Sequence, residues 1–198
     1  MSRTYRLSST GESTGWTSDP ENRLIWRANR KRLTAEAIRD SILSVSGQLS
    51  MQQGGPTIRK FSQYDWGYEF NTIRRSVYVP LFRNTLLEVM EAFDVANPNV
   101  VSGRRSETTL PTQALYLMNS PFVNAEAERA GERIIRSGVS DAERVRLVYR
   151  LALGREPSAV EADVVMKFIE ESKTGQKSRA WSALVHSLFG SVDFRHLD

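Results

Sequence analysis

Residues 103–123 read GRRSETTLPTQALYLMNSPFV, a stretch of 21 residues that contains two helix starts. Pro111 begins a short apolar helix over residues 111–118, since proline is tolerated in the first turn of a helix. Ser120 and Pro121 begin the next one, because a serine N-cap followed by proline is a typical helix start. The stretch therefore predicts two consecutive helices, and it places the chain among helical proteins.

The residues downstream continue this pattern of short, capped helices. A serine followed three residues later by a glutamate is the signature of a capping box. This spacing occurs at Ser140 with Glu143 and again at Ser158 with Glu161. A last helix is expected over about residues 179–189.

Apolar residues at intervals of three and four predict which face of each helix turns inward. In the last helix they are Trp181, Leu184, Val185, Leu188 and Phe189. In the two capped helices before it they are Val145, Val148, Leu151, Val160, Val164, Val165, Phe168 and Ile169. Short helices joined by short loops pack antiparallel, so we expect a helical bundle over residues 111–198.

Upstream of residue 103 the helical pattern is weaker. Asp19-Pro20 has the residues of a helix start and predicts a helix over about residues 20–29. Thr34 caps a further helix, which Gly47 can end early. Its inward residues have the spacing of a helix face and are Ile38, Ile42, Val45 and Leu49.

Residues 50–80 have a different pattern. Gly54-Gly55-Pro56 breaks any regular structure. Aromatic residues then alternate from Tyr64 to Phe70, and apolar residues alternate with polar ones over 72–79. A period of two is typical of extended chain rather than of a helix. We therefore expect one small β-hairpin around residues 58–80.

Together these patterns predict a mainly α protein, an antiparallel bundle of short helices with one irregular segment. Asn84 caps a short helix that runs to about Phe93. Residues 1–18 are predicted to form an irregular arm, and residues 19–110 an arginine-rich subdomain of helices and irregular chain. We expect this subdomain and the bundle subdomain, residues 111–198, to form one compact unit.

The composition excludes several kinds of chemistry. The chain has no cysteine, which excludes disulfides, thiolate metal ligands and cysteine nucleophiles. Its two histidines, His186 and His196, have no further ligands at the spacing of a zinc site. Phosphate-binding glycine loops and serine-hydrolase motifs are absent, as are any apolar run of membrane-spanning length and the apolar stretch of a signal peptide. We therefore expect no catalytic residue, metal or cofactor in this chain.

Arginine supplies most of the positive charge. The net charge is +4, only five residues are lysine, and residues 1–105 hold 15 basic against 10 acidic residues. The candidate contacts for an anion or a carboxylate are the paired residues Arg74, Arg75, Arg104 and Arg105. A guanidinium fork suits phosphates and carboxylates. The alternative, which we favour, is that these arginines tie irregular segments to backbone carbonyls or to acidic side chains.

Six segments resemble a known bacterial family. They are TYRLSS (4–9), DPENRLIWRANRKRLTAEAIRDSILSVSG (19–47), GGP (54–56), RRSVYVPLFRN (74–84), FDVANPNVVSGRRSETTLPTQALYLMNSPFV (93–123) and RLVYRLALGREPSAVEAD (146–163). In order and content they resemble the planctomycete-specific domain of unknown function found at the C-terminal end of large proteins that also carry c-type cytochrome modules. In that family the TYRLSS-like residues lie well inside the domain, so this chain resembles its C-terminal portion.

The resemblance implies an exported, extracytoplasmic parent protein and supplies no catalytic residues. Any haem would belong to a separate upstream module, because this chain lacks the Cys-Xaa-Xaa-Cys-His attachment motif.

Three functions remain open at this point. The favoured hypothesis is a non-catalytic interaction or structural module, which contacts the missing N-terminal portion of its parent or another protein. The alternative is an enzyme or binding domain for an anionic extracellular polysaccharide, which the arginine pairs would bind. Nucleic-acid binding is the least favoured, since it needs basic and exposed aromatic residues on one face.

Overall fold

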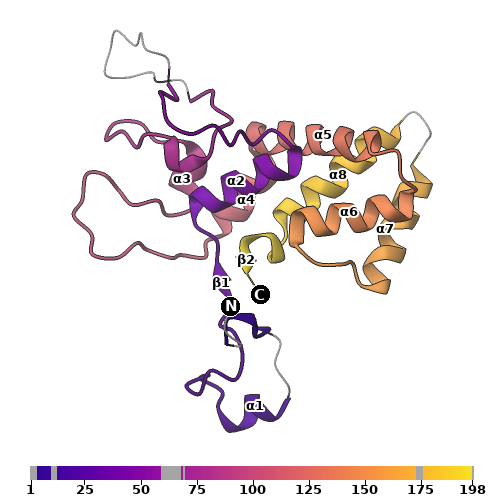
Figure 1. Cartoon of the computed structure of the whole chain (residues 1–198), viewed down its shortest axis with the longest axis horizontal. Coiled ribbons are helices and arrows are strands. Elements are labelled where there is room, and N and C mark those ends of the chain that lie inside the picture. The colour runs from indigo at the N-terminus through magenta and orange to yellow at the C-terminus, as the bar shows by residue number, and fades with distance from the viewer. Residues whose placement is uncertain (1–3, 10–12, 59–67, 69, 173–175, 198) are drawn as a thin grey trace.

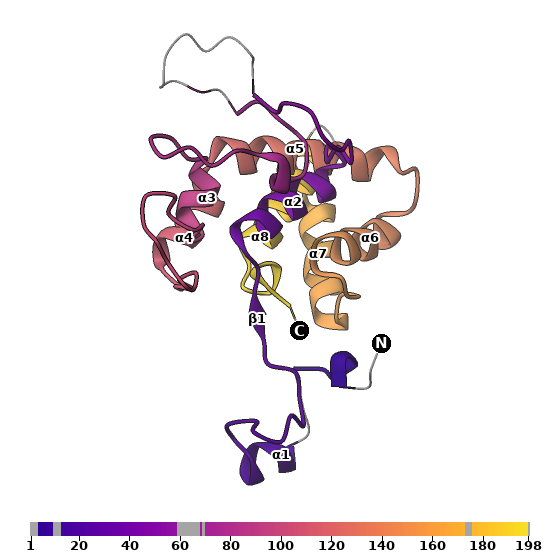
Figure 2. The ribbon, with the colours of Figure 1, turned by 60° about the vertical axis from the view of Figure 1, so that its left-hand side comes forward.

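The computed structural model describes residues 4–9, 13–58, 68, 70–172 and 176–197. Most of these residues form a helical body, and the N-terminal residues form a small lobe that stands off the body (Figure 1). The second view shows the same separation (Figure 2). The mainly α prediction is confirmed, whereas the division of the chain at residues 18 and 110 stays a prediction.

Two long helices form the centre of the body. Helix α5 (Pro121–Arg136) and helix α8 (Lys177–Gly190) pack against each other along most of their length. They approach closely at Gly131, where a Cβ atom would lie 2.7 Å from the backbone nitrogen of Ser182. Helix α2 (Ala35–Ser46) lies against the other side of α5.

The remaining helices surround this centre. Helices α6 (Asp141–Leu153) and α7 (Ala159–Glu171) form a hairpin beside α8. Helix α3 (Glu88–Ala92) packs against α2, and α4 (Pro111–Asn119) packs against α3, α5 and α8. No described helix is both long enough and apolar enough to cross a membrane.

Local hydrogen bonds explain where the bundle helices begin and end. Both predicted capping boxes are present, with Ser140 and Ser158 each accepting from the backbone of the glutamate three residues on. Gly47 and Gly154 end α2 and α6 in the left-handed conformation that glycine adopts without steric cost. The predicted boundaries of these helices are therefore confirmed to within a few residues.

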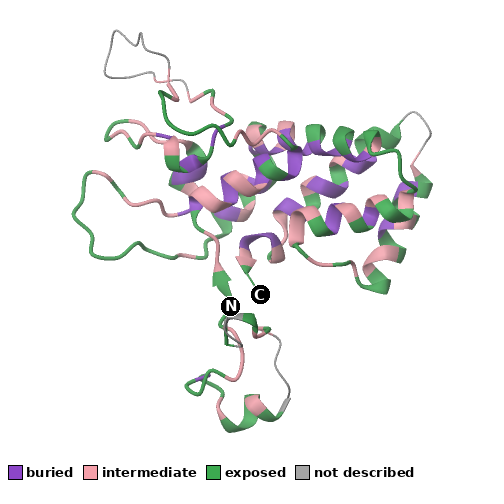
Figure 3. Cartoon of the chain, viewed as in Figure 1, coloured by how far each residue is buried: buried purple, intermediate pink, exposed green. Residues whose placement is uncertain are grey.

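The core lies between α2, α5 and α8 (Figure 3). All five inward residues predicted for α8 are buried, as are Ile38, Ile42 and Val45 of α2. In α7 the prediction is wrong for Val160, Val164 and Phe168, which are exposed. Among the described elements helix α7 packs mainly against α6 and α8, so it buries a narrow stripe made by Val165 and Ile169.

The strand pair lies outside the segment where a hairpin was expected. Strand β1 (Lys31–Arg32) pairs antiparallel with β2 (His196–Leu197). This pairing connects the chain just before α2 to the C-terminal segment. Within 70–80 the described chain has only the 3-10 helix η2 (Ser76–Tyr78) and one isolated bridge, since α2 side chains bind its backbone groups instead of a second strand. Residues 59–67 lie outside the described residues.

Helix α3 is shorter than expected. It begins after Leu87 instead of at Asn84, so Asn84 is not its N-cap. Its inward residue Met90 and the following Phe93 are buried against α2 and α4, as the spacing predicts. The intervening residues are irregular chain.

The N-terminal lobe contains the 3-10 helix η1 (Thr4–Arg6) and helix α1 (Ser13–Ser18). The helix expected over residues 20–29 is not formed, and turns occupy this range. The Asp19 carboxylate accepts from the backbone N–H groups of Arg23 and Leu24, which holds the chain in a tight loop rather than capping a helix.

Candidate functional site

Arg74, the first of the four predicted site arginines, is buried and holds a loop. Its guanidinium donates to the carbonyl oxygens of Gln52, Gly54, Gly55 and Pro56. These bonds use all of its donors, and the Tyr78 ring lies 5.2 Å from the guanidinium carbon. Arg74 therefore ties the Gly-Gly-Pro loop to the chain that precedes η2.

The other three predicted arginines do not join Arg74 in one site. Arg75 and Arg104 are exposed. Arg105 lies at a different place, where its Nη1 is 2.8 and 3.0 Å from the two carboxylate oxygens of Glu36 on α2. Arg74 is thus buried against a loop and Arg105 is paired with Glu36, and the proposed contact of the four arginines with an external anion stays a prediction.

Sequence reasoning missed two arginines that connect distant segments. Arg32 binds the Asp94 carboxylate at 2.8 Å and also donates to the carbonyl oxygen of Thr108. Arg133 donates to the last carbonyls of α2, those of Ser44 and Val45, at 2.9 Å each. Arg32 belongs to the basic run Arg30-Lys31-Arg32, but nothing local shows which groups it or Arg133 binds, so only the fold identifies these contacts.

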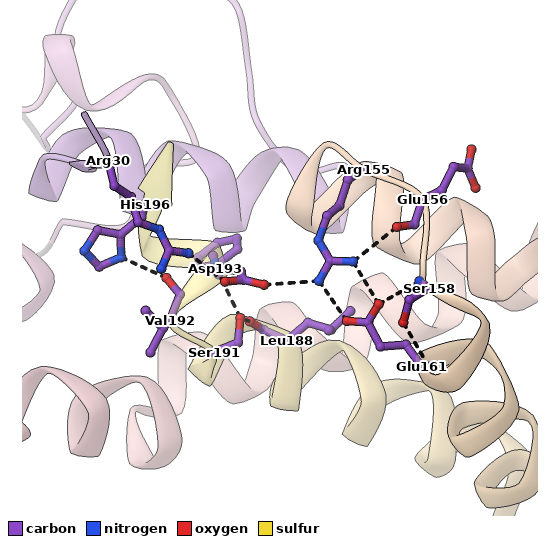
Figure 4. Close-up of polar contacts among 11 residues, drawn as sticks. Arg30, Arg155, Glu156, Ser158, Glu161, Leu188, Ser191, Val192, Asp193 and His196 are labelled. Carbon is purple, nitrogen blue, oxygen red and sulfur yellow. Dashed lines mark hydrogen bonds and ion pairs between the residues drawn. The ribbon is translucent and has the colours of Figure 1, made fainter. Parts of the chain in front are cut away.

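A third missed arginine, Arg155, is the centre of an ion-pair network (Figure 4). It binds Glu161 through two hydrogen bonds of 2.9 and 2.7 Å. It also lies 3.1 Å from Asp193, whose second oxygen is 2.7 Å from Arg30 at the base of the lobe. The network joins the α6–α7 turn, the C-terminal segment and the lobe.

This network shifts the protonation of its acidic members. The hydrogen bonds from Arg155, with those from Ser158, lower the pKa of Glu161 from 4.5 to about 2. Hydrogen bonds from Arg30 and Arg155 likewise lower the pKa of Asp193. Both carboxylates are therefore charged at neutral pH, which suits a structural clamp rather than a proton-transferring group.

The two histidines contact backbone carbonyls. His186 Nε2 lies 3.0 Å from the Leu117 oxygen, and His196 Nδ1 lies 2.9 Å from the Val192 oxygen. Within the described residues no group of three or more His, Asp or Glu side chains could hold a metal ion.

The lobe presents apolar side chains to solvent. Leu24 is 84% exposed, Ile25 is 56% exposed and Trp16 is 49% exposed. The Arg27 guanidinium lies beside two indoles that contact each other edge-on, 4.1 Å from the Trp16 ring and 5.4 Å from the Trp26 ring. No apolar residue among the described residues before Ala35 is buried, so the lobe has no core of its own (Figure 3).

Hydrogen bonds hold the exposed loop in one conformation. Asn22 is buried, and its amide nitrogen donates to the Arg27 carbonyl at 2.8 Å and to the Asn29 side chain at 3.0 Å. The Trp26 indole donates to the Asp19 carbonyl at 2.9 Å. Ile25 has a φ of 54°, a conformation that is strained for a β-branched residue. Strained backbone of this kind is typical of residues at functional sites, where a fixed position of the side chain is required.

The lobe is also basic. Its described residues up to Thr34 contain six arginines or lysines and only two acidic residues, Asp19 and Glu21. The lobe thus combines exposed apolar side chains with more basic than acidic residues, which favours a partner surface that has both apolar and acidic groups.

The comparisons with known proteins identify a family. The family model described as PSD1, "Protein of unknown function (DUF1553)", matches residues 1–169, and the chain belongs to this family. The predicted membership in a family of unknown function is thereby confirmed. No curated protein and no solved structure matches the chain.

Proposed function

We propose that this chain is a non-catalytic interaction and structural module of an exported multidomain protein associated with c-type cytochrome modules. The resemblance of its six segments supports the exported parent and the cytochrome association. In this proposal any haem belongs to a separate upstream module.

The observation that carries the interaction role is the N-terminal lobe. It exposes Trp16 on α1, and Leu24 and Ile25 on a loop that hydrogen bonds hold in one conformation. Burying a leucine, isoleucine or comparable side chain contributes about 1.5–3 kcal/mol. A preorganised loop loses little conformational entropy on binding, so most of this free energy is available for association.

The proposed partner is a protein surface with an apolar hollow and an acidic rim. It belongs to the upstream part of the parent protein or to another exported protein. The basic residues of the lobe support an acidic rim, and the exposed aliphatic pair supports the hollow.

Hydrogen exchange tests this proposal. We expect backbone amides of residues 13–29 to exchange at least about tenfold more slowly in the parent protein than in the chain alone, because a tenfold change corresponds to about 1.4 kcal/mol of protection. The double substitution Leu24→Asp, Ile25→Asp in the parent should restore fast exchange.

The control is Val160→Asp, which alters an exposed valine on α7 outside the lobe and should leave the protection unchanged. Equal exchange rates of residues 13–29 in the chain and in the parent would overturn the proposal.

A further inference from the structure

A cleft of about 580 Å³ is lined by α2, α4, α5, the start of α3, and the irregular chain at Tyr68, residues 70–73 and residues 85–87. This volume is within the range of small-molecule sites in proteins. Its aromatic walls are Tyr68, Phe70, Tyr116 and Phe122, which come from three separate parts of the chain. Neither the interaction surface of the lobe nor the Arg155 network contributes a residue to it.

Neighbouring rings hold two of these aromatic walls in place. The Tyr68 ring stacks on Phe82 with centroids 4.2 Å apart. The Tyr116 ring meets the buried Phe93 edge-on at 6.1 Å. The cleft thus offers fixed apolar ring surfaces without a rearrangement of the bundle.

A buried carboxylate in the cleft wall lacks part of its hydrogen bonding. The Glu126 side chain is only 4% exposed, and its Oε1 accepts from Arg129 Nη1. Its Oε2 is buried and has no hydrogen-bond donor among the described residues. A buried acceptor without a donor costs free energy, so this oxygen favours a ligand that brings a hydrogen-bond donor.

The charges of the cleft select against an ionic ligand. Two guanidiniums, those of Arg39 and Arg129, face the cleft together with the carboxylates of Glu88 and Glu126. Arg39 donates to the carbonyls of Thr72 and Arg74 and to Ser76, so it is engaged by the protein. An anion would meet two carboxylates and a cation two guanidiniums, which leaves a neutral ligand as the best match.

We propose that this cleft binds an uncharged saccharide. One sugar hydroxyl donates to Glu126 Oε2, a second accepts from Arg129, and the C–H face of the ring lies on the aromatic walls. Hydroxyl groups fit because each is both donor and acceptor. Because Oε2 is buried, the proposal includes a movement of the half-exposed Arg129 side chain that gives the ligand access to this oxygen.

Calorimetric titration of the full chain with neutral, acidic and amino sugars tests the proposal. The neutral probes are glucose, galactose, mannose, xylose and their short oligomers. Galacturonate is the negatively charged probe and glucosamine the positively charged one. We expect at least one neutral saccharide to bind with a Kd of about 1 mM or tighter. Preference for galacturonate or glucosamine, or no binding of any neutral saccharide, would overturn the proposal.

Substitutions then locate the bound sugar. Glu126→Gln should weaken binding by about tenfold or more, because hydrogen bonds to charged groups contribute about 1.5–3 kcal/mol. The matched control is Glu128→Gln, an exposed glutamate on the same helix that does not line the cleft. Unchanged binding by Glu126→Gln would overturn the assignment.

Arg129→Ala is a second variant in case Glu126→Gln fails to fold. The Arg129 side chain is half exposed but binds the buried Glu126 carboxylate, so its removal should lower stability, and the melting temperature is measured beside binding. We expect Arg129→Ala to weaken saccharide binding about fivefold or more, which corresponds to the loss of one hydrogen bond. Unweakened binding by Arg129→Ala, with the chain still folded, would also overturn the proposal.

Discussion

The helical bundle and the N-terminal lobe are stabilised by different interactions. In the bundle, large side chains such as Trp181 and Phe189 are fully buried. In the lobe, Trp16 and Leu24 are exposed, and hydrogen bonds from Asp19 and Asn22 hold the chain instead. The bundle therefore draws its stability from buried apolar side chains, whereas the lobe leaves its apolar surface available for a partner. The predictions below test this contrast, from the largest expected effect to the smallest.

Replacing a tryptophan should separate the two regions most clearly. Trp181→Ala should lower the free energy of unfolding by about 3–5 kcal/mol, the usual cost of removing a buried aromatic side chain. Trp16→Ala should lower it by less than about 1 kcal/mol, since the lobe contributes no buried apolar side chain. Urea denaturation followed by circular dichroism measures both. Equal losses would show that the lobe is part of the core.

The close contact between α5 and α8 should also be sensitive to an added side-chain atom. A Cβ atom at Gly131 would meet the Ser182 backbone at 2.7 Å, so Gly131→Ala should cost about 1–3 kcal/mol through overpacking. Gly103→Ala is the matched control, because no atom lies within 4 Å of a Cβ at that position. Denaturation midpoints of the two variants give the comparison. A Gly131→Ala variant as stable as the control would contradict the tight helix contact.

The Arg155 network predicts a dependence of stability on pH. The folded-state pKa of Glu161 is lowered from 4.5 to about 2, so its contribution is present above pH 4.5 and is lost as the pH falls through about 2. Because the pair is partly exposed, Glu161→Gln should cost only about 1 kcal/mol at pH 7.

Unfolding measured from pH 7 down to pH 2 should show the wild type and Glu161→Gln converging. Glu170→Gln, an exposed residue of α7 outside the network, serves as the control and should follow the wild type throughout. A constant difference between wild type and Glu161→Gln across this range would argue against the ion pairs.

The strained lobe residue should give the smallest global effect. Ile25→Gly relieves a positive φ that costs a β-branched residue about 1–2 kcal/mol locally. Because the lobe does not pack into the bundle core, the free energy of global unfolding should change by less than about 0.5 kcal/mol. Hydrogen exchange of residues 19–29 measures the local change, and denaturation measures the global one. A large global shift would mean that the lobe and the bundle unfold together.

Much of the bundle could be predicted from sequence because its signals are local. The capping boxes at Ser140 and Ser158 act within one helical turn. The inward-facing residues of α8 follow from the helical period. The capping boxes and this inward face could therefore both be recognised from the sequence alone. The same period failed for α7, because an outer helix buries only part of an apolar face.

The candidate sites were less predictable. Arg74 was a candidate for an anion contact, but its donors are occupied by backbone carbonyls. The paired residues of the proposed saccharide cleft, Glu126 and Arg129, lie on one helix at a spacing typical of any helix surface. Nothing local distinguishes them from solvated charges, so the burial of Glu126 became evident only in the folded chain.

The sequence by itself determined the helical class of this protein, the starts of its C-terminal helices and the packed face of α8. Only the tertiary structure decided that residues 20–29 form a strained loop, that β1 pairs with β2, and which arginines are buried. The physical reason is distance along the chain. Caps and helical periodicity depend on residues within a few positions of one another, whereas burial and long-range hydrogen bonds depend on which distant segments meet.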